Sequence, residues 1–207
     1  LAYYERCRAI LEQILPTRHP DLARLCNNMA ALYQSLTQYD TALAYYERCR
    51  AIFEQILPAQ HPNLASLYMN MAATYQGLTQ YAAALAYYER CRAIREQILP
   101  AQHPDLASLY MNMASAYLGL TQYDTALTYY ERCRAIFEQI LPAQHPDLAM
   151  LYANIALLYA HQSQFPKAQA YIDKAVAIFQ QTLPPQHPHL QQVLNIQSII
   201  HHILPNN

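Results

Sequence analysis

The sequence predicts an all-α protein, a right-handed α-solenoid of antiparallel helix pairs with 42-residue repeats. The chain repeats itself at Pro16, Pro58, Pro100, Pro142 and Pro184, and residues 58–99 match residues 100–141 at 34 of 42 positions. Each repeat also holds two runs of apolar residues at the helical spacing of three and four. A helix pair of this size cannot bury its apolar stripe alone, so neighbouring pairs must stack around a continuous core.

The repeat boundaries divide a single array, residues 1–207, into segments. Residues 1–15 are the second helix of an incomplete repeat, and residues 16–57, 58–99 and 100–141 are near-identical repeats. Residues 142–183 are a diverged repeat, and residues 184–207 are a C-terminal capping helix and tail. Because the chain starts with Leu1 in the middle of this pattern, we expect a fragment of a longer protein.

The first helix of each repeat, helix A below, follows a His-Pro pair. In residues 100–141 it is expected from Pro104 to about Leu120. Proline at the first turn gives up an amide that no helical carbonyl would use, and Asp105 suits the positive end of the helix dipole. We expect the histidines of the five pairs to order their loops and cap these helices, because histidines on separate loops cannot share one metal ion.

The second helix, helix B below, is expected from Tyr123 to Ile140. Its apolar residues again recur at spacings of three and four, and Pro142 ends it by removing an amide donor and crowding the preceding turn. On the same pattern a last helix is expected from about Pro188 to Ile203.

Small and aromatic residues alternate along both helices, with Ala114 and Tyr117 in helix A and Tyr123, Ala126 and Tyr130 in helix B. This alternation resembles the tetratricopeptide repeat, and the His-Pro-Asp-Leu-Ala opening with its 42-residue length resembles the kinesin light chain subtype. The resemblance covers essentially the whole chain. It implies a scaffold for protein–protein interaction that holds a peptide or partner domain on a concave surface lined by A helices.

Composition argues against several other classes. The two glycines, Gly77 and Gly119, are too far apart for a phosphate-cradling loop, so no nucleotide cofactor is expected. Thirteen basic and fourteen acidic residues give a net charge of −1, which predicts no nucleic-acid or membrane partner. No apolar run approaches the roughly 20 residues of a membrane-spanning helix.

Two groups of repeated side chains are expected to be structural, so no catalytic or metal-binding residue is predicted and the protein is not expected to be an enzyme. Glutamates of helix B, such as Glu138 beside Arg134, have the spacing of surface ion pairs. Equivalent cysteines lie about one helix pair apart, on the order of 10 Å, too far for disulfides. We interpret them as buried free thiols in a cytoplasmic protein; they are Cys7, Cys49, Cys91 and Cys133.

The resemblance also selects candidate binding residues, because helix A lines the concave face in this family. Four asparagines recur there at the repeat spacing, although asparagine is a poor residue inside a helix. Their amides suit the backbone of an extended ligand, and a structural hydrogen bond to the preceding repeat is the alternative. The candidate residues are Arg24, Asn27, Asn28, Ser66, Met69, Asn70, Ser108, Met111, Asn112 and Asn154.

The expected ligand is neutral and partly apolar, because helix A adds only Arg24 as a cation to this face. An alternative function is a structural spacer that self-associates head to tail through exposed terminal helices. For that function the last helix would present an apolar face made of Leu190, Val193, Leu194, Ile196, Ile199, Ile200 and Ile203.

Overall fold

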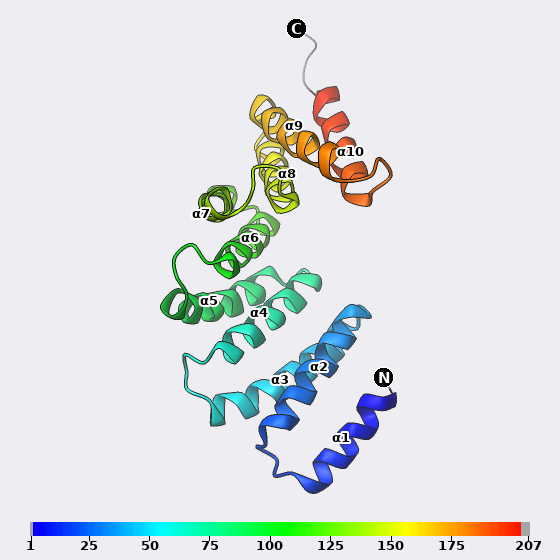
Figure 1. Ribbon diagram of the computed structural model, residues 1–207, viewed down its shortest axis with the longest axis vertical. Helices are drawn as coiled ribbons and strands as arrows, with labels where there is room; N and C mark the ends of the chain where they lie inside the picture. Colours follow the sequence, from blue (N-terminus) through cyan, green and yellow to red (C-terminus); the bar gives the residue numbers. More distant parts are fainter. Residues whose placement is uncertain (1, 204–207) are drawn as a thin grey trace. The chain divides into compact units, whose positions relative to one another are not determined.

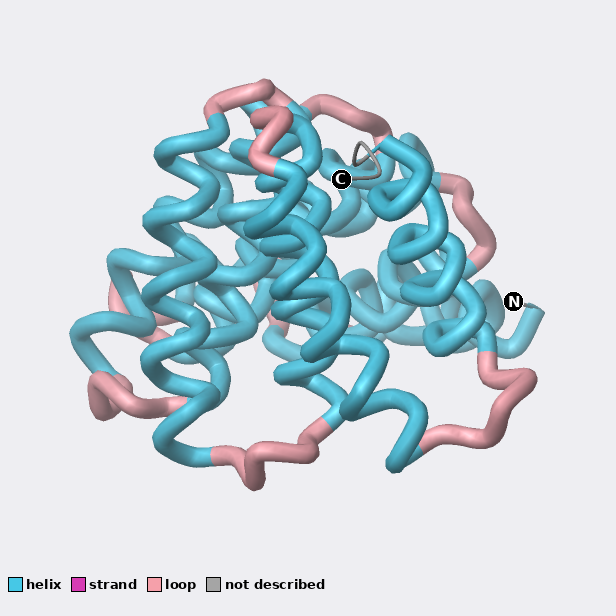
Figure 2. The backbone as a smooth tube through the Cα atoms, turned by 90° about the horizontal axis from the view of Figure 1, so that it is seen from above, coloured by secondary structure: helices cyan, strands magenta, loops and turns pink. Residues whose placement is uncertain are grey.

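The computed structural model describes residues 2–203, apart from the side chains of residues 2, 8 and 203. These residues form ten helices and no strand (Figures 1 and 2). The expected all-α array of helix pairs is confirmed. The helices are α1 (Ala2–Ile14), α2 (Pro20–Ser35), α3 (Tyr39–Ile56), α4 (Pro62–Gly77), α5 (Tyr81–Ile98), α6 (Pro104–Gly119), α7 (Tyr123–Ile140), α8 (Pro146–His161), α9 (Phe165–Thr182) and α10 (Pro188–Ile203).

Helices A and B alternate as expected and differ in length. Helices α2, α4, α6 and α8 are A helices of 16 residues each, and α3, α5, α7 and α9 are B helices of 18 residues each. The helix α1 is a shorter B helix, and α10 has the length and register of an A helix. The chain forms two compact units, residues 1–100 with α1–α5 and residues 101–207 with α6–α10.

A histidine caps the start of every A helix and of α10. In all five the following proline occupies the first helical position and the Nδ1 atom of the histidine accepts the backbone N–H two residues on; in the four A helices the backbone of the histidine is extended. This satisfies one of the donors that an α-helix leaves unpaired at its N-terminus. The expected capping role is therefore confirmed for His19, His61, His103, His145 and His187, with N···Nδ1 distances of 3.1 or 3.2 Å.

The turn from helix A to helix B has a left-handed residue that is never glycine. In the first complete repeat, Thr37 has φ 58°, its N–H donates to the Gln34 carbonyl, and the Gln38 N–H donates to the Tyr33 carbonyl. These two bonds form a Schellman motif, which usually places glycine at this position. Equivalent positive φ values occur at Thr79, Thr121 and Ser163.

Adjacent repeats in the first unit approach closely at Gly77. A Cβ atom on this residue would lie 2.7 Å from Cζ of Tyr39, which stands at the start of the preceding B helix. No side chain fits in that space without movement of the ring. Glycine therefore leaves room here for the Tyr39 ring in its present position, and its φ is not in the left-handed region.

Tyrosine and cysteine from helix B fill the core. Tyr46 and Cys49 are fully buried, and the Tyr46 hydroxyl donates to Gln34 at 2.9 Å. Burial raises the pKa of the Cys49 and Cys133 thiols to about 12, so both stay protonated. All five cysteines are free, and the buried position expected for the repeated ones is confirmed except at Cys7, which is partly exposed.

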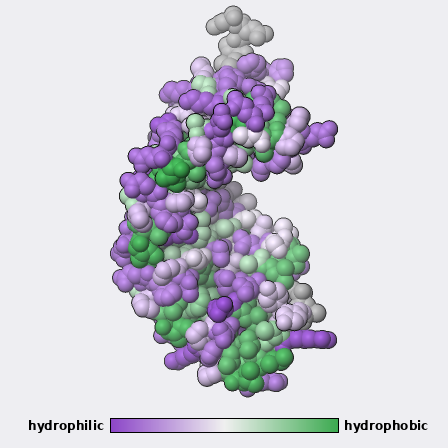
Figure 3. All heavy atoms as spheres, viewed as in Figure 1, coloured by the Kyte–Doolittle hydropathy of each residue, from purple (hydrophilic) through white to green (hydrophobic). Residues whose placement is uncertain are grey.

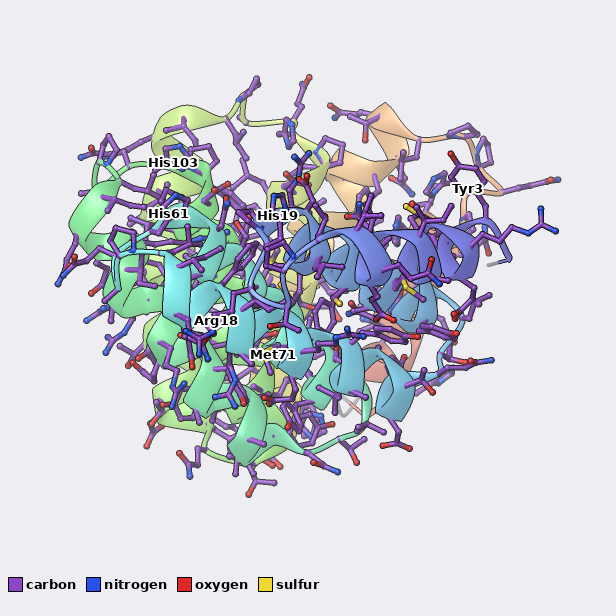
Figure 4. All side chains as sticks on the ribbon, turned by 90° about the horizontal axis from the view of Figure 1, so that it is seen from below. Tyr3, Arg18, His19, His61, Met71 and His103 are labelled. Carbon is purple, nitrogen blue, oxygen red and sulfur yellow. The ribbon has the colours of Figure 1, made fainter. Side chains whose placement is uncertain are left out.

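The two terminal helices differ in how far they are covered. Ile10 of α1 is 57% exposed, whereas the equivalent residues of the three following B helices, Ile52, Ile94 and Ile136, are 6–7% exposed. No helix among the described residues covers this side of α1, and hydrophobic residues lie on this part of the surface (Figure 3). Tyr3, near the start of α1 in Figure 4, is also exposed.

The expected apolar end face of α10 is wrong for three of its residues. Leu190, Val193 and Ile200 are at most 4% exposed, because α10 packs on α9 and α8. Polar side chains fix this packing: Gln197 donates to Asp173 at 2.6 Å, and a ring nitrogen of His201 lies 2.9 Å from Gln169 Oε1. Leu194 and Ile196 are half-buried, Ile199 is exposed, and the side chain of Ile203 lies outside the described residues.

Candidate functional site

Four of the predicted binding residues line one cavity in the first unit. Arg24, Asn27 and Asn28 reach it from α2, and Ser66 reaches it from α4. The cavity has a volume of about 250 Å³. Buried residues of α2 occupy the opposite face of the helix, which leaves Arg24, Asn27 and Asn28 on its outer face. These buried residues include Leu22, Ala23, Leu25 and Cys26.

Sequence reasoning missed three further lining residues, Phe53, Asn63 and Leu67. Phe53 and Leu67 are buried and form an apolar floor, and Phe53 comes from helix B. Asn63 lies one helical turn before Ser66, a spacing from which it could have been found. It replaces the aspartate that the other A helices carry at this position, at residues 21, 105 and 147.

Charge around this cavity is nearly balanced. Arg24 has a side chain 75% exposed, and its Nη1 lies 3.7 Å from Oδ1 of Asp21 one turn away on the same helix. An exposed ion pair of this kind contributes little stability, so the guanidinium remains available for hydrogen bonding. With Asn63 on the facing helix in place of an acid, the rim offers amide, hydroxyl and guanidinium groups around an apolar floor.

The remaining predicted residues lie on the expected helices and are half-buried. Met69 and Asn70 follow Ser66 on α4. In the second unit, Ser108, Met111 and Asn112 lie on α6 and Asn154 lies on α8, and the cavity described below for this unit is lined by other residues. The structure therefore gathers the first-unit residues Arg24, Asn27, Asn28 and Ser66 into one cavity and leaves the others as a half-exposed helix face.

The asparagine ladder has no structural hydrogen bond within residues 2–203. The side-chain amides of Asn28, Asn70, Asn112 and Asn154 form none with other described residues. Only the backbone carbonyl of Asn70 is engaged, as the acceptor for the Thr74 hydroxyl at 2.8 Å. For Asn28, Asn70 and Asn154, whose preceding repeats lie in the same unit, the hydrogen bond that would give the ladder a purely structural role is therefore not formed among the described residues.

A second set of polar contacts joins consecutive repeats, and sequence reasoning missed it. The Tyr87 hydroxyl of α5 donates to Glu47 of α3 at 3.0 Å, and the Tyr68 hydroxyl of α4 donates to Glu54 at 3.0 Å. Arg50 completes the cluster, with its Nη2 2.6 Å from Glu47. These glutamates are half-exposed as expected, but their main partners include tyrosines of the next repeat.

Equivalent residues in the second unit form related contacts. The Tyr152 hydroxyl of α8 donates to Glu138 of α7 at 3.1 Å, and the expected Arg134–Glu138 ion pair is confirmed at 3.7 Å. Arg134 is closer to Glu131, at 2.5 Å, and donates to the Tyr171 hydroxyl of α9 at 2.9 Å. The sequence shows each tyrosine and glutamate but not their pairing, because the partners are 14 or about 40 residues apart.

Aromatic rings stack beside these contacts. Tyr75 of α4 and Tyr87 of α5 lie parallel with centroids 5.4 Å apart, and Tyr117 and Tyr129 repeat the same geometry in the second unit. The Arg90 guanidinium lies 5.6 Å from the Tyr87 ring centroid. Burial, followed by the hydrogen bond to Glu47, raises the pKa of Tyr87 to about 12. These stacked rings and hydrogen bonds therefore link neighbouring helices within each unit.

Residues 2–203 include neither a candidate metal cluster nor a candidate membrane-spanning helix. No group of three or more histidine, cysteine, aspartate or glutamate side chains in this part of the chain could hold a metal ion. Within the same range, no helix is both long and apolar enough to cross a membrane. What the described site offers is a face of hydrogen-bonding groups on stacked A helices.

Stacked helix pairs of this kind define an α-helical repeat protein. The family profile described as Tetratricopeptide repeat matches residues 1–55, 21–97, 63–139 and 105–181. The chain therefore belongs to the tetratricopeptide repeat family, whose members generally mediate protein–protein interaction and are typically non-enzymatic. No curated protein sequence matches the chain.

Solved structures agree with this assignment. A Podosopora anserina protein assigned as a kinesin light chain, with nearly identical TPR-like repeats, is 26% identical with a TM-score of 0.75, over 89% of this chain and 87% of that one. BtubC (BKLC) from P. vanneervenii is 22% identical with a TM-score of 0.77, over 96% and 79%. Aspartyl phosphate phosphatase F from Bacillus subtilis is 18% identical with a TM-score of 0.78, over 96% and 50%.

The last two similarities concern the fold alone, because the identities are low. The first, together with the family match, confirms the expected likeness to kinesin light chain repeats.

Proposed function

We propose that the protein binds a neutral, partly apolar, extended segment of a partner protein along the helix A face, and that the cavity between α2 and α4 is one contact point. The observation that supports this most directly is the convergence of Arg24, Asn27, Asn28 and Ser66 on one cavity. A role in partner binding also accounts for asparagine amides that have no hydrogen bond within the described residues.

The chemistry of the cavity fits a peptide backbone. Each asparagine side chain offers two N–H donors and a carbonyl acceptor, which match the carbonyl and N–H groups of an extended chain. The buried Phe53 and Leu67 would contact one small apolar side chain. A strongly charged ligand would find only Arg24, which already faces Asp21. We also infer, from the free cysteines, that the protein works in a reducing compartment such as the cytoplasm.

Peptide selection from a random library, followed by calorimetric titration of one selected peptide, tests this function. Replacing both Asn27 and Asn28 by alanine should weaken binding about thirtyfold, because each lost amide bond contributes on the order of 1 kcal/mol. The matched control is Gln97→Ala, an exposed amide on α5 outside the cavity. Predominantly acidic selected peptides, or unchanged affinity after Asn70→Ala combined with Asn112→Ala, would argue against the proposal.

Head-to-tail self-association is the second candidate function, and the exposed side of α1 is the observation that favours it. Ile10 and Ile14 are 57% and 66% exposed there. At the other end only Ile199 among the described residues of α10 is both large and exposed, which leaves a smaller apolar surface. Light scattering at several concentrations tests this candidate. A constant monomer mass would leave only the helix A face.

A further inference from the structure

The second unit carries an apolar cleft among α8, α9 and α10 with a volume of about 280 Å³. Leu157 and His161 line it from α8, Phe165 lines it from the start of α9, and Ile196, Ile199 and Ile200 line it from α10. Ile199 is 52% exposed, so part of the lining is in contact with solvent. The cleft is therefore open to solvent on one side and could admit a side chain of another molecule.

Internal comparison shows that the cleft is specific to this end of the chain. Ile196 occupies the position of the asparagine ladder, where the four earlier A helices carry Asn28, Asn70, Asn112 and Asn154. Leu157 and Ile199 occupy a position that is alanine or serine at residues 31, 73 and 115. The fold does not require large apolar residues at these positions, because three near-identical repeats are built without them.

The charge pattern restricts what can enter the cleft. The helix α10 contains no aspartate, glutamate, lysine or arginine, and Asp147, in the first turn, is the one such residue of α8. The helix α9 carries Lys167 close to Phe165, and its Nζ lies 5.2 Å from the centroid of the Tyr159 ring. A charged group placed against Leu157 and the isoleucines would lose its hydration without gaining a partner. His161 closes one side, and its ring is held by stacking on Tyr123 of α7 with centroids 6.0 Å apart.

We propose that this cleft binds one large uncharged apolar side chain, of the leucine, isoleucine or phenylalanine type, from a partner segment. The proposal rests on the proposed function, because it names the anchor that the bound segment would place on the second unit. The volume is sufficient: an apolar cavity of about 150 Å³ accepts benzene. Removing such a side chain from the bound segment should therefore weaken binding about tenfold or more.

The test uses the 207-residue chain and one peptide obtained from a random library by selection on it. The peptide and its versions with the apolar anchor changed to alanine or aspartate are titrated by calorimetry into the protein and into the variant Ile199→Asn. The proposal expects a shared leucine, isoleucine or phenylalanine in the selected peptides. It also expects a loss of about tenfold or more from either change, in the range reported for apolar pockets.

Controls separate this outcome from others. Ser198→Ala changes an exposed neighbour of Ile199 that does not line the cleft, so it should leave peptide affinity unchanged. If Ile199→Asn unfolds α10, Leu157→Ala serves as a second cleft variant. Thermal melts followed by circular dichroism check folding. If affinity falls with Asn27→Ala and Asn28→Ala but not with either cleft variant, the helix A function stands and the anchor proposal is overturned.

Two other occupants of the cleft would also overturn it. If deleting residues 204–207 raises peptide affinity about tenfold, the cleft is occupied by the chain's own C-terminus. If Ile199→Asn changes the molecular mass measured by sedimentation without changing peptide affinity, the occupant is a second copy of the chain. Failure of every selected peptide to respond to either set of variants would refute both proposals together.

Discussion

The bond between Tyr87 and Glu47 offers a direct test of how consecutive repeats are held together. Replacing Tyr87 by phenylalanine removes one hydroxyl and keeps the ring, including its stacking on Tyr75 at 5.4 Å. The structure also supplies a matched control. Among the described residues the Tyr75 hydroxyl forms no hydrogen bond, so Tyr75→Phe makes the same chemical change without breaking one.

The magnitude follows from the surroundings of this bond. A buried hydrogen bond to a charged group contributes about 1.5–3 kcal/mol to stability. Here the carboxylate of Glu47 is 37% exposed and keeps its ion pair with Arg50 at 2.6 Å, so solvent and Arg50 compensate for part of the loss. We expect Tyr87→Phe to lower the free energy of unfolding by about 1 kcal/mol. Tyr75→Phe should lower it by less than about 0.5 kcal/mol.

Urea unfolding followed by circular dichroism measures both values, and a double-mutant cycle with Glu47→Gln isolates the pair. The cycle should give a coupling energy of about 0.5–1 kcal/mol between Tyr87 and Glu47. Equal destabilisation by Tyr87→Phe and Tyr75→Phe, together with no coupling in the cycle, would refute the reasoning that this bond links the two repeats.

Three further outcomes are expected. His61→Ala should lower stability by about 1 kcal/mol through loss of the helix cap, whereas His61→Asp, which can still accept the N–H, should lose much less in the same urea titration. Ile94→Ala should cost about 3 kcal/mol but Ile10→Ala less than about 1, because only the first side chain is buried, and thermal melts would show the contrast. Burial raises the pKa of Tyr46, Tyr87 and Tyr152 from about 10 to about 12, so the folded state holds these protons more tightly than the unfolded state. Their contribution to stability should be complete below pH 10 and lost as the pH rises to 12, which unfolding at successive pH values would detect.

Much of the fold could be predicted because the repeat supplies the same evidence several times. The His-Pro pairs locate the start of each A helix, and the structure shows why: the imidazole accepts an N–H at 3.1 or 3.2 Å and the proline takes the first helical position. Helix limits predicted from one repeat, such as Tyr123–Ile140, hold because local spacing and prolines determine them.

The candidate site was predicted in part. Arg24, Asn27, Asn28 and Ser66 were expected together and do line one cavity, since they lie on the outer side of helices whose buried side is clear from the apolar pattern. Phe53 was missed because it belongs to the buried apolar face of a B helix. It reaches the cavity only because α3 packs against α4. The apolar end face predicted for α10 failed for Leu190, Val193 and Ile200, because the pattern could not show that α9 and α8 cover them.

By itself, then, the sequence determined the helix limits, the repeat and the family, because these depend on local propensity and on spacing along the chain. Only the tertiary structure decided which residues meet between repeats. Tyr87 and Glu47 are 40 residues apart, Gly77 faces Tyr39, and the cleft at Ile199 needs three helices. Such contacts depend on the distance and the angle at which one helix pair stacks on the next. A sequence pattern that is repeated in every pair does not specify this distance or this angle.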